Sequence, residues 1–251
     1  MPERFFLATG SVDRGSVAID GRLAQHIAAS LRMRPGDAIV AVDEHGLEHG
    51  VRLRSVVRER VEGEVTWSRP ATGEPQLRIT VVQALPRERM EDCIDILVEA
   101  GAAEIRPAVT ERVVSRAGGD RLATRVQRWQ AIAAESAQLA GRGMIPRVLA
   151  PVSLSDALAS LTPGTRVLAC TFPAPDAIAD VTVDAVRPLA LCIGPEGGFG
   201  DRDIDALHDA AAEHVHIGAR VMRTRYAGAV ACAVLLGRSG DLSLTASPPP
   251  S

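Results

Sequence analysis

Apolar and polar residues alternate along the first 70 residues in short runs that are separated by turns. The apolar-rich runs are FFLA, SVAI, DAIVAVD, HGVRLRSVV and VEGEVTWS. Runs of this length, interrupted by turns such as RPGD and EHG, are typical of short strands. The stretch LAQHIAASLRM (23–33) alone has the spacing of a helix. The pattern therefore predicts a small β-barrel over residues 1–72.

The rhythm changes after SRPATGEPQ (68–76), a polar stretch with Pro and Gly that we interpret as a linker. Apolar runs without polar alternation follow: LRITVVQAL, EIRPAV, RVLACTF, PLALCI and HVHIG. Segments with helical spacing stand among them: RERMEDCIDILVEAGA, DRLATRVQRWQAIAAESAQLAG, SLSDALASL, DRDIDALHDAAAE and AGAVACAVLLGR. Apolar strands that alternate with helices are typical of a largely parallel sheet covered on both faces. Residues 73–251 are predicted to form this α/β domain.

The stretch LCIGPEGGFG (191–200) joins one of the apolar strands to a turn with three glycines in five residues. In α/β sheets, ligands bind beyond the carboxyl ends of strands, where bare backbone can approach them. A second stretch, HIGARVMRTRYAGA (216–229), also passes from a strand through glycine into a helix. Two such loops on adjacent strands predict one small-molecule pocket. The patterns GxGxxG and GxSxG are absent, so neither a dinucleotide site nor a serine hydrolase has support.

Composition narrows the chemistry further. The 251 residues include 28 cationic side chains, all of them arginine, and the net charge is −3. The lack of lysine excludes a catalytic lysine and the GxxxxGK[ST] phosphate loop. The net charge argues against a uniformly basic nucleic-acid binder but leaves a local basic patch open.

Cysteine usage and apolar content bear on the compartment. Four well-separated cysteines predict buried thiols in a reducing compartment, not disulfides or a zinc site: Cys93, Cys170, Cys192 and Cys232. No apolar stretch reaches the ~20 residues that span a bilayer, and no export signal is evident. We therefore expect a cytoplasmic protein.

Three further features have both a functional and a plain structural interpretation. DEHGLEHG (43–50) could hold a metal, but a polar hairpin is favoured because ligands there would lie on a flexible turn. His214 and His216 share one face of a strand, which favours packing. Trp129 lies at helical spacing from Val126 and is expected to anchor a helix in the core. Aromatic residues make up only 3% of the chain, so broad stacking on single-stranded RNA is not expected.

Six motifs occur together along nearly the whole chain. They are RFFL (4–7), H-x4-LR-x3-GD (26–37), EAGAAEIRP (99–107), RWQAIAAESAQLAGRGMIP (128–146), IGPEGGF (193–199) and IGARVMRT (217–224). This set resembles the ribosomal RNA small subunit methyltransferase E family of the SPOUT superfamily. The pairing of IGPEGG with G-x-R-x-x-R-T is the specific part of the resemblance. It implies a PUA-like barrel ahead of a SPOUT domain with a deep trefoil knot, assembled as a homodimer.

The resemblance also implies the reaction, which is methylation of N3 of one uridine in 16S rRNA by S-adenosylmethionine. No metal is expected. The cofactor is expected to contact loops at the ends of three strands, through Leu168, Thr171, Ile193, Gly194, Glu196, Gly197, Gly198, Ile217, Gly218, Val221, Met222 and Thr224. Within this set, Glu196 has a second interpretation, in which its carboxylate only holds a loop or caps the helix near Asp201.

Uracil must lose its N3 proton as it accepts the methyl group, and a cation near O2 or O4 would stabilise the resulting anion. Arg223, with Arg220 behind it, is the candidate. Relatives commonly read R-T-E-T here, whereas this chain has Arg225 and Tyr226 in place of the Glu and Thr. The missing carboxylate leaves one alternative, a non-catalytic RNA-binding or ribosome-assembly protein that keeps the fold.

Contacts to 16S rRNA within the 30S subunit are expected from arginines at turns and at the ends of elements. The candidates are Arg4, Arg32, Arg34, Arg87, Arg89, Arg112, Arg116 and Arg142.

Overall fold

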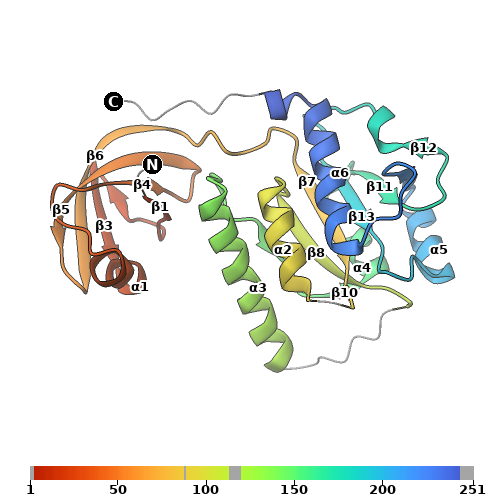
Figure 1. The fold of residues 1–251 in the computed structure, drawn as a ribbon, viewed down its shortest axis with the longest axis horizontal. Coiled ribbons are helices and arrows are strands. Elements are labelled where there is room, and N and C mark those ends of the chain that lie inside the picture. Colours follow the sequence, from red (N-terminus) through yellow and green to blue (C-terminus); the bar gives the residue numbers. More distant parts are fainter. Residues whose placement is uncertain (1–2, 88, 113–119, 244–251) are drawn as a thin grey trace. The chain divides into compact units, whose positions relative to one another are not determined.

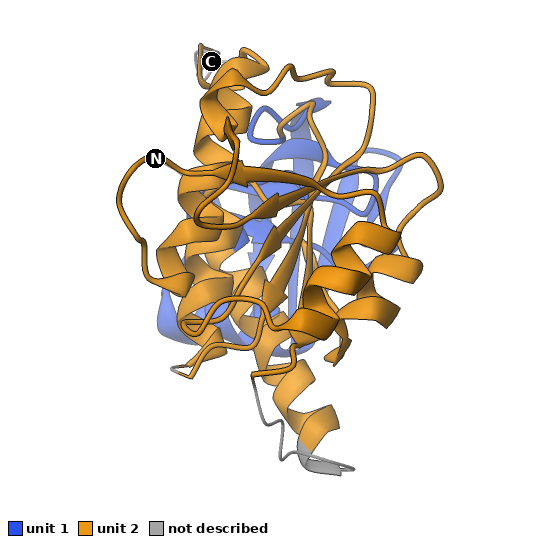
Figure 2. Cartoon of the chain, turned by 90° about the vertical axis from the view of Figure 1, so that its right-hand side faces the viewer, with its two compact units in different colours: residues 1–74, 137–145, 245–251 blue, residues 75–136, 146–244 orange. Residues whose placement is uncertain are grey.

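The computed structural model describes residues 3–87, 89–112 and 120–243, and these divide into two compact units (Figure 2). The first unit contains the described residues up to 74 together with 137–145. The second contains 75–136 and 146–243. The division at 74 lies within the expected linker, 68–76, whereas 137–145 was expected in the second domain.

The first unit is a six-stranded sheet with one short helical segment. Its elements are β1 (Glu3–Phe6), β2 (Val12–Asp13), β3 (Ser16–Asp20), α1 (Gly21–Gln25), the π-helical turn η1 (His26–Ser30), β4 (Ala38–Val42), β5 (Leu47–Val56) and β6 (Arg60–Pro70). The strand order is β1-β4-β5-β6-β3-β2, with β1 parallel to β4 and the other pairs antiparallel. β2 has two residues and pairs with β3, so among the described residues the sheet is open and the expected closed barrel is not found.

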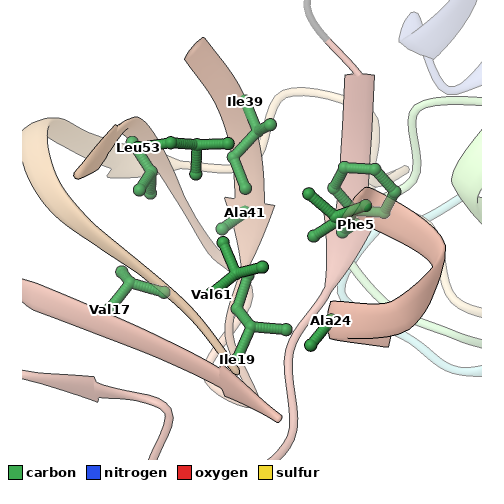
Figure 3. Close-up of a cluster of buried hydrophobic side chains, with 10 residues drawn as sticks. Phe5, Val17, Ile19, Ala24, Ile39, Ala41, Leu53 and Val61 are labelled. Atoms are coloured by element: carbon green, nitrogen blue, oxygen red, sulfur yellow. The ribbon is translucent and has the colours of Figure 1, made fainter. Parts of the chain in front are cut away.

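The core of the first unit lies on one face of this sheet (Figure 3). Phe5, Ile39 and Leu53 are almost fully buried there, together with Ala24 from α1. The predicted helix over 23–33 is shorter in the structure and ends in the π-helical turn. The predicted polar hairpin at 43–50 is confirmed, because Asp43 accepts hydrogen bonds at 2.9 Å from the amides of His45 and Leu47.

The segment 137–145 packs on residues 71–74 around one ion pair. The Arg142 guanidinium, in a residue only 3% exposed, donates to both carboxylate oxygens of Glu74, at 2.7 and 2.9 Å. The amides of Gly143 and Met144 donate to the same carboxylate. A buried, paired arginine cannot reach RNA, so this geometry corrects the expected role of Arg142.

The second unit is an eight-stranded sheet between two layers of helices (Figures 1 and 2). The strands are β7 (Ile79–Ala84), β8 (Glu104–Val109), β9 (Arg147–Val148), β10 (Val152–Ser153), β11 (Arg166–Cys170), β12 (Asp176–Ala177), β13 (Leu189–Ile193) and β14 (Glu213–His216). The helices are α2 (Met90–Glu99), α3 (Asp120–Leu139), α4 (Leu154–Ala159), η2 (Ile178–Asp180), α5 (Asp201–Asp209), α6 (Thr224–Arg238) and η3 (Asp241–Ser243). None of the described helices is long and apolar enough to cross a membrane.

The strand order is β10-β8-β7-β13-β11-β14-β12, with β9 also beside β8, and every pair in it is parallel. The α/β prediction with a parallel sheet is therefore confirmed. All five residues of β13 are buried, as expected for a strand covered on both faces. Trp129 on α3 is fully buried, which confirms its expected place in the core.

Parallel strands end at the same edge, so the loops after β11, β13 and β14 gather on one side of the sheet. The chain then returns through α6, which packs on α2, β7 and β13. This return depends on Gly228, because a Cβ there would lie 2.8 Å from Leu97 Cδ2 and 3.4 Å from Ile193 Cγ1.

We expect Gly228→Val to lower the free energy of unfolding by ~1–3 kcal/mol, the usual cost of forcing extra methyl groups into a packed core. Denaturant unfolding measures this change. Gly237→Val in the same helix is the matched control, since among the described residues a Cβ there meets only Leu242 Cδ1, at 3.5 Å. Equal unfolding midpoints for the two variants would contradict the packing described for α6.

Candidate functional site

A cavity of about 730 Å³ opens where β11, β13 and β14 end, within the second unit. This volume lies within the ~300–1,000 Å³ of small-molecule sites. Its wall is formed by Arg112, Cys170, Thr171, Phe172, Pro173, Ile193, Gly194, Pro195, Glu196, Gly197, Gly198, Phe199, Ile204, His214, Ile217, Arg220, Val221, Met222, Arg223, Thr224 and Ala227. Three loops on neighbouring strands thus form one pocket.

The turn after β13 is a tight backbone structure. The Gly198 amide donates to the Pro195 carbonyl at 2.9 Å, and Gly198 has φ +70°, a value that favours glycine. The Phe199 ring lies against Gly194, where a Cβ would stand 3.3 Å from Phe199 Cε2. Small residues here let an aromatic ring and the backbone pack closely.

Two side chains hold this turn against the neighbouring loops. The Glu196 carboxylate accepts a hydrogen bond from the Arg87 amide at 3.2 Å, which ties the turn to the loop after β7. Arg112, just beyond β8, donates from Nη1 to the Gly197 carbonyl. Glu196 therefore has the loop-holding contact of its second interpretation and also lines the cavity.

The start of α5 is fixed by a reciprocal pair of carboxylates. Asp203, almost fully buried, accepts hydrogen bonds from the amides of Gly200 at 2.9 Å and of Glu111 at 3.1 Å. Glu111 in turn accepts from the Arg202 amide at 2.9 Å. The donors at the start of α5 are therefore satisfied by Glu111, which accepts from the second residue of the helix, and by Asp203, which accepts from Gly200 just before it. Neither bond involves Glu196.

The loop after β14 forms the wall beside α6. The Thr224 hydroxyl donates to the Gly194 carbonyl at 3.1 Å, which fastens the start of α6 to the end of β13. Arg220, Val221 and Arg223 precede it, and all three are exposed and line the cavity. This wall thus combines cationic and apolar groups.

The loop after β11 completes the pocket. The Thr171 hydroxyl lies 3.2 Å from Nδ1 of His214, and both residues line the cavity. Burial raises the pKa of the Cys170 thiol far above its ordinary value and raises the pKa of Cys192 to about 12. Both thiols stay protonated at neutral pH, so neither is a ready nucleophile. Cys93, Cys192 and Cys232 are buried, whereas Cys170 is half-buried.

Most of the predicted cofactor contacts come together in this wall, with two exceptions. Leu168 is fully buried in β11 and is not part of the wall, so the structure corrects its placement. Gly218, with φ +94°, lies just beyond β14 and donates its amide to His216 Nδ1, outside the lining. The candidate catalytic pair, Arg220 and Arg223, lies in the wall.

Sequence reasoning missed several lining residues, chiefly Phe172, Ile204 and His214. Phe172 is the last residue of the predicted strand RVLACTF (166–172), and this position at a strand end is the signal that could have found it. His214 was interpreted as a packing residue because alternation along a strand does not show which face meets a cavity.

The predicted RNA-contacting arginines fall into distinct groups. Arg32, Arg34, Arg87 and Arg89 are exposed. Arg112 is exposed and also bonded to the turn after β13. Arg4 is mostly buried, with Nη1 donating to the buried Glu48 carboxylate at 2.8 Å. Arg116 lies outside the described residues.

Arg225 and Tyr226, the two positions at which the sequence departs from the expected R-T-E-T pattern, interact with each other. The Arg225 guanidinium lies 4.5 Å from the centre of the Tyr226 ring and donates to its hydroxyl at 2.5 Å. The pair stands in the first turn of α6.

Sequence and structure comparisons agree on one group of proteins. A family model described as an RNA methyltransferase domain matches residues 73–236. A ribosomal RNA small subunit methyltransferase E of Mycobacterium bovis is 34% identical over 244 residues, which cover 92% of this chain and 88% of that protein. The protein of the same name from Bacillus subtilis is 24% identical over 221 residues, which cover 84% of this chain and 85% of that protein.

One of the similar solved structures contains a bound ligand. It is a ribosomal RNA small subunit methyltransferase E from Neisseria gonorrhoeae bound to S-adenosyl methionine, with 26% identity and a TM-score of 0.84. The match covers 94% of this chain and 98% of that chain.

Proposed function

The chain belongs to the ribosomal RNA small subunit methyltransferase E family, and from this premise we propose that it methylates N3 of one uridine in 16S rRNA. It is an S-adenosylmethionine-dependent RNA methyltransferase. The observation that carries the proposal is the pocket at the strand ends, where a backbone-rich turn faces two exposed arginines. Mapping of the modified nucleotide in 16S rRNA, with and without the gene, tests the position.

The residues of the pocket fit the cofactor. At Gly197 a Cβ would meet no described atom closer than Arg112 Cδ at 3.5 Å, so protein packing does not require glycine there. The bare backbone is therefore free to face a ligand. We assign cofactor contacts to this turn, to Ile217 and Met222, and to Thr171. When bound, S-adenosylmethionine supplies an electrophilic methyl group on a sulfonium.

The rest of the chemistry falls to side chains of this chain. A neutral uracil imide is a poor nucleophile, and negative charge spreads onto O2 and O4 as the N3 proton leaves. A guanidinium stays protonated and presents planar paired donors, which suits such a carbonyl edge. Arg223 is assigned this role, with Arg220 beside it. Positioning of the two reactants supplies much of the remaining acceleration.

Domain roles follow from the same premise. The first unit is assigned as a PUA-like RNA-binding domain, and the second as a SPOUT domain with a trefoil knot. The path of the chain supports the knot. After β14, which lies on the far side of β11 from β13, the chain returns through α6, and α6 packs on α2 and β13. A crystallographic trace of residues 166–238 tests it.

We assign the protein as a homodimer that acts in the cytoplasm. The outward residues of α6 support the dimer, because Val230, Ala233 and Val234 are apolar and not buried. Sedimentation velocity at micromolar concentration tests the assignment, and a fully active monomer would overturn it. The non-catalytic alternative depended on the missing carboxylate alone, and the pocket and the relatives favour the enzyme.

We expect Gly197→Val to weaken cofactor binding by about 5- to 150-fold, because a β-branched side chain intrudes where the ligand meets backbone, at a cost of ~1–3 kcal/mol. Calorimetric titration with S-adenosylmethionine measures the affinity. The free energy of unfolding should change by no more than ~0.5 kcal/mol, as for most surface sites. Gly237→Val, outside the pocket, is the control, and unchanged affinity in Gly197→Val would make the turn merely structural.

We expect Arg223→Ala to lower the single-turnover rate at saturating RNA by ~10²–10³, the usual effect of removing an oxyanion-type donor. RNA affinity should stay nearly intact. The rival role, a grip on a phosphate, predicts the opposite: weaker binding with a flatter salt dependence and a nearly normal saturated rate. That result would contradict the assignment of Arg223, and Arg220, Arg225 or main-chain amides would then have to stabilise the developing charge.

We expect the Arg32→Gln/Arg34→Gln double variant to weaken binding to 30S subunits and to reduce the salt slope of binding by about 1.4–1.8, the value for two lost phosphate contacts. Filter binding across a salt series measures both quantities. Arg54→Gln removes the same kind of charge from the first unit, but Arg54 is paired with Glu64 at 2.6 Å and serves as control. Equal salt slopes in all three proteins would remove this surface from the RNA contact.

A further inference from the structure

Phe172 is a large apolar side chain exposed at the wall of the pocket. It is 62% exposed, whereas Trp129, in the same unit, is fully buried. Single exposed apolar residues are common on protein surfaces, so exposure alone means little. The position is what matters, since Phe172 lines the cavity assigned to methyl transfer.

The backbone on both sides of Phe172 is constrained. The preceding residue, Thr171, donates its amide to the Val215 carbonyl at 3.0 Å and has its hydroxyl 3.2 Å from His214 Nδ1. The following residue is Pro173, whose ring restricts its own backbone and the residue before it. An exposed aromatic ring with a constrained backbone loses little conformational freedom when a ligand covers it.

The surroundings of Phe172 match the chemistry of a pyrimidine base. Val221, 83% exposed, lines the same cavity from the loop after β14, and β14 pairs directly with β11. Arg220 and Arg223 stand on either side of Val221 along the chain and are exposed. The cavity wall therefore offers an apolar face and cationic donors together, as a planar base with carbonyl edges requires.

We propose that Phe172 is the stacking platform for the acceptor pyrimidine after it leaves the RNA stack. Enzymes that modify a base hold it outside the stack in a pocket, and proteins stack splayed RNA bases on aromatic side chains. Phe172 is thus a positioning residue of the methylation reaction. This inference rests on the proposed function.

The test compares the full-length wild type with Phe172→Ala, Phe172→Leu and Phe172→Trp. The substrate is 30S subunits from cells that lack the enzyme. Three quantities are measured: affinity for S-adenosylmethionine, affinity for the subunits, and the single-turnover rate with both saturating. Val186→Ala is the control, because Val186 is 92% exposed and is not among the lining residues.

We expect Phe172→Ala to lower the single-turnover rate about 5- to 150-fold, the range that corresponds to loss of one base–aromatic stack. Both affinities should stay close to wild type, because phosphate contacts dominate RNA binding. Phe172→Trp should restore most of the rate, whereas Phe172→Leu, apolar but not aromatic, should not. Val186→Ala should behave as wild type.

Other occupants of this surface give different results, and each overturns the proposal. Cofactor affinity that falls in step with the rate would place Phe172 against the adenine of the cofactor. A change in sedimentation would place it between two copies of the chain. Full activity in Phe172→Ala would leave it without a role. If the wild type itself does not methylate the subunits, the proposed function fails and the assignment of Phe172 falls with it.

Discussion

The parallel pairing of β13 on both sides is the constraint on which the second unit depends. Five residues of this strand, Leu189–Ile193, pair with β7 on one side and with β11 on the other. All five are buried, so the strand requires a helical layer over each face. Its carboxyl end leads straight into Gly194, and the pocket is therefore anchored at the centre of the sheet.

The loops around that end are held by polar contacts between segments distant in sequence. Glu196 reaches the Arg87 amide after β7, Arg112 reaches the Gly197 carbonyl from beyond β8, and Thr224 bonds the Gly194 carbonyl from α6. Each contact joins the turn to a different neighbour, so its backbone is fixed before a ligand arrives. Preorganisation of this kind lowers the cost of binding.

Much of the fold could be predicted from the sequence because apolar periodicity is a local signal. β8 was predicted with its observed bounds, and α4 lies within the predicted helical segment SLSDALASL (153–161), directly after its cap Ser153. The two-residue strands β2, β9, β10 and β12 were not predicted, since two residues carry no period. The predicted helix over 23–33 extended too far toward the carboxyl end. The apolar spacing continues through Leu31 and Met33, beyond the π-helical turn that ends at Ser30.

The candidate site was harder to predict, because the fate of an arginine or histidine depends on partners far along the chain. Arg142 pairs with Glu74, 68 residues away, and Arg4 pairs with Glu48, 44 residues away. The local sequence around an arginine does not reveal a partner at such a distance along the chain. The glycine turn and Arg223 could be placed in the pocket from the sequence, because each belongs to a contiguous motif. Leu168 was misplaced, since the strand buries its side chain in the core rather than toward the cavity.

The distribution of charge by depth connects the two binding tasks of the pocket. The sulfonium of the cofactor is cationic, and three arginines line the same cavity. In a water-poor interior the sulfonium and the guanidinium groups would repel each other. The arginines Arg112, Arg220 and Arg223 are all exposed, where water and salt screen them, whereas Ile193 and Thr224 in the same wall are almost fully buried and carry no charge. The buried, uncharged part of the wall therefore suits a cationic cofactor, and the exposed guanidinium groups suit anionic RNA.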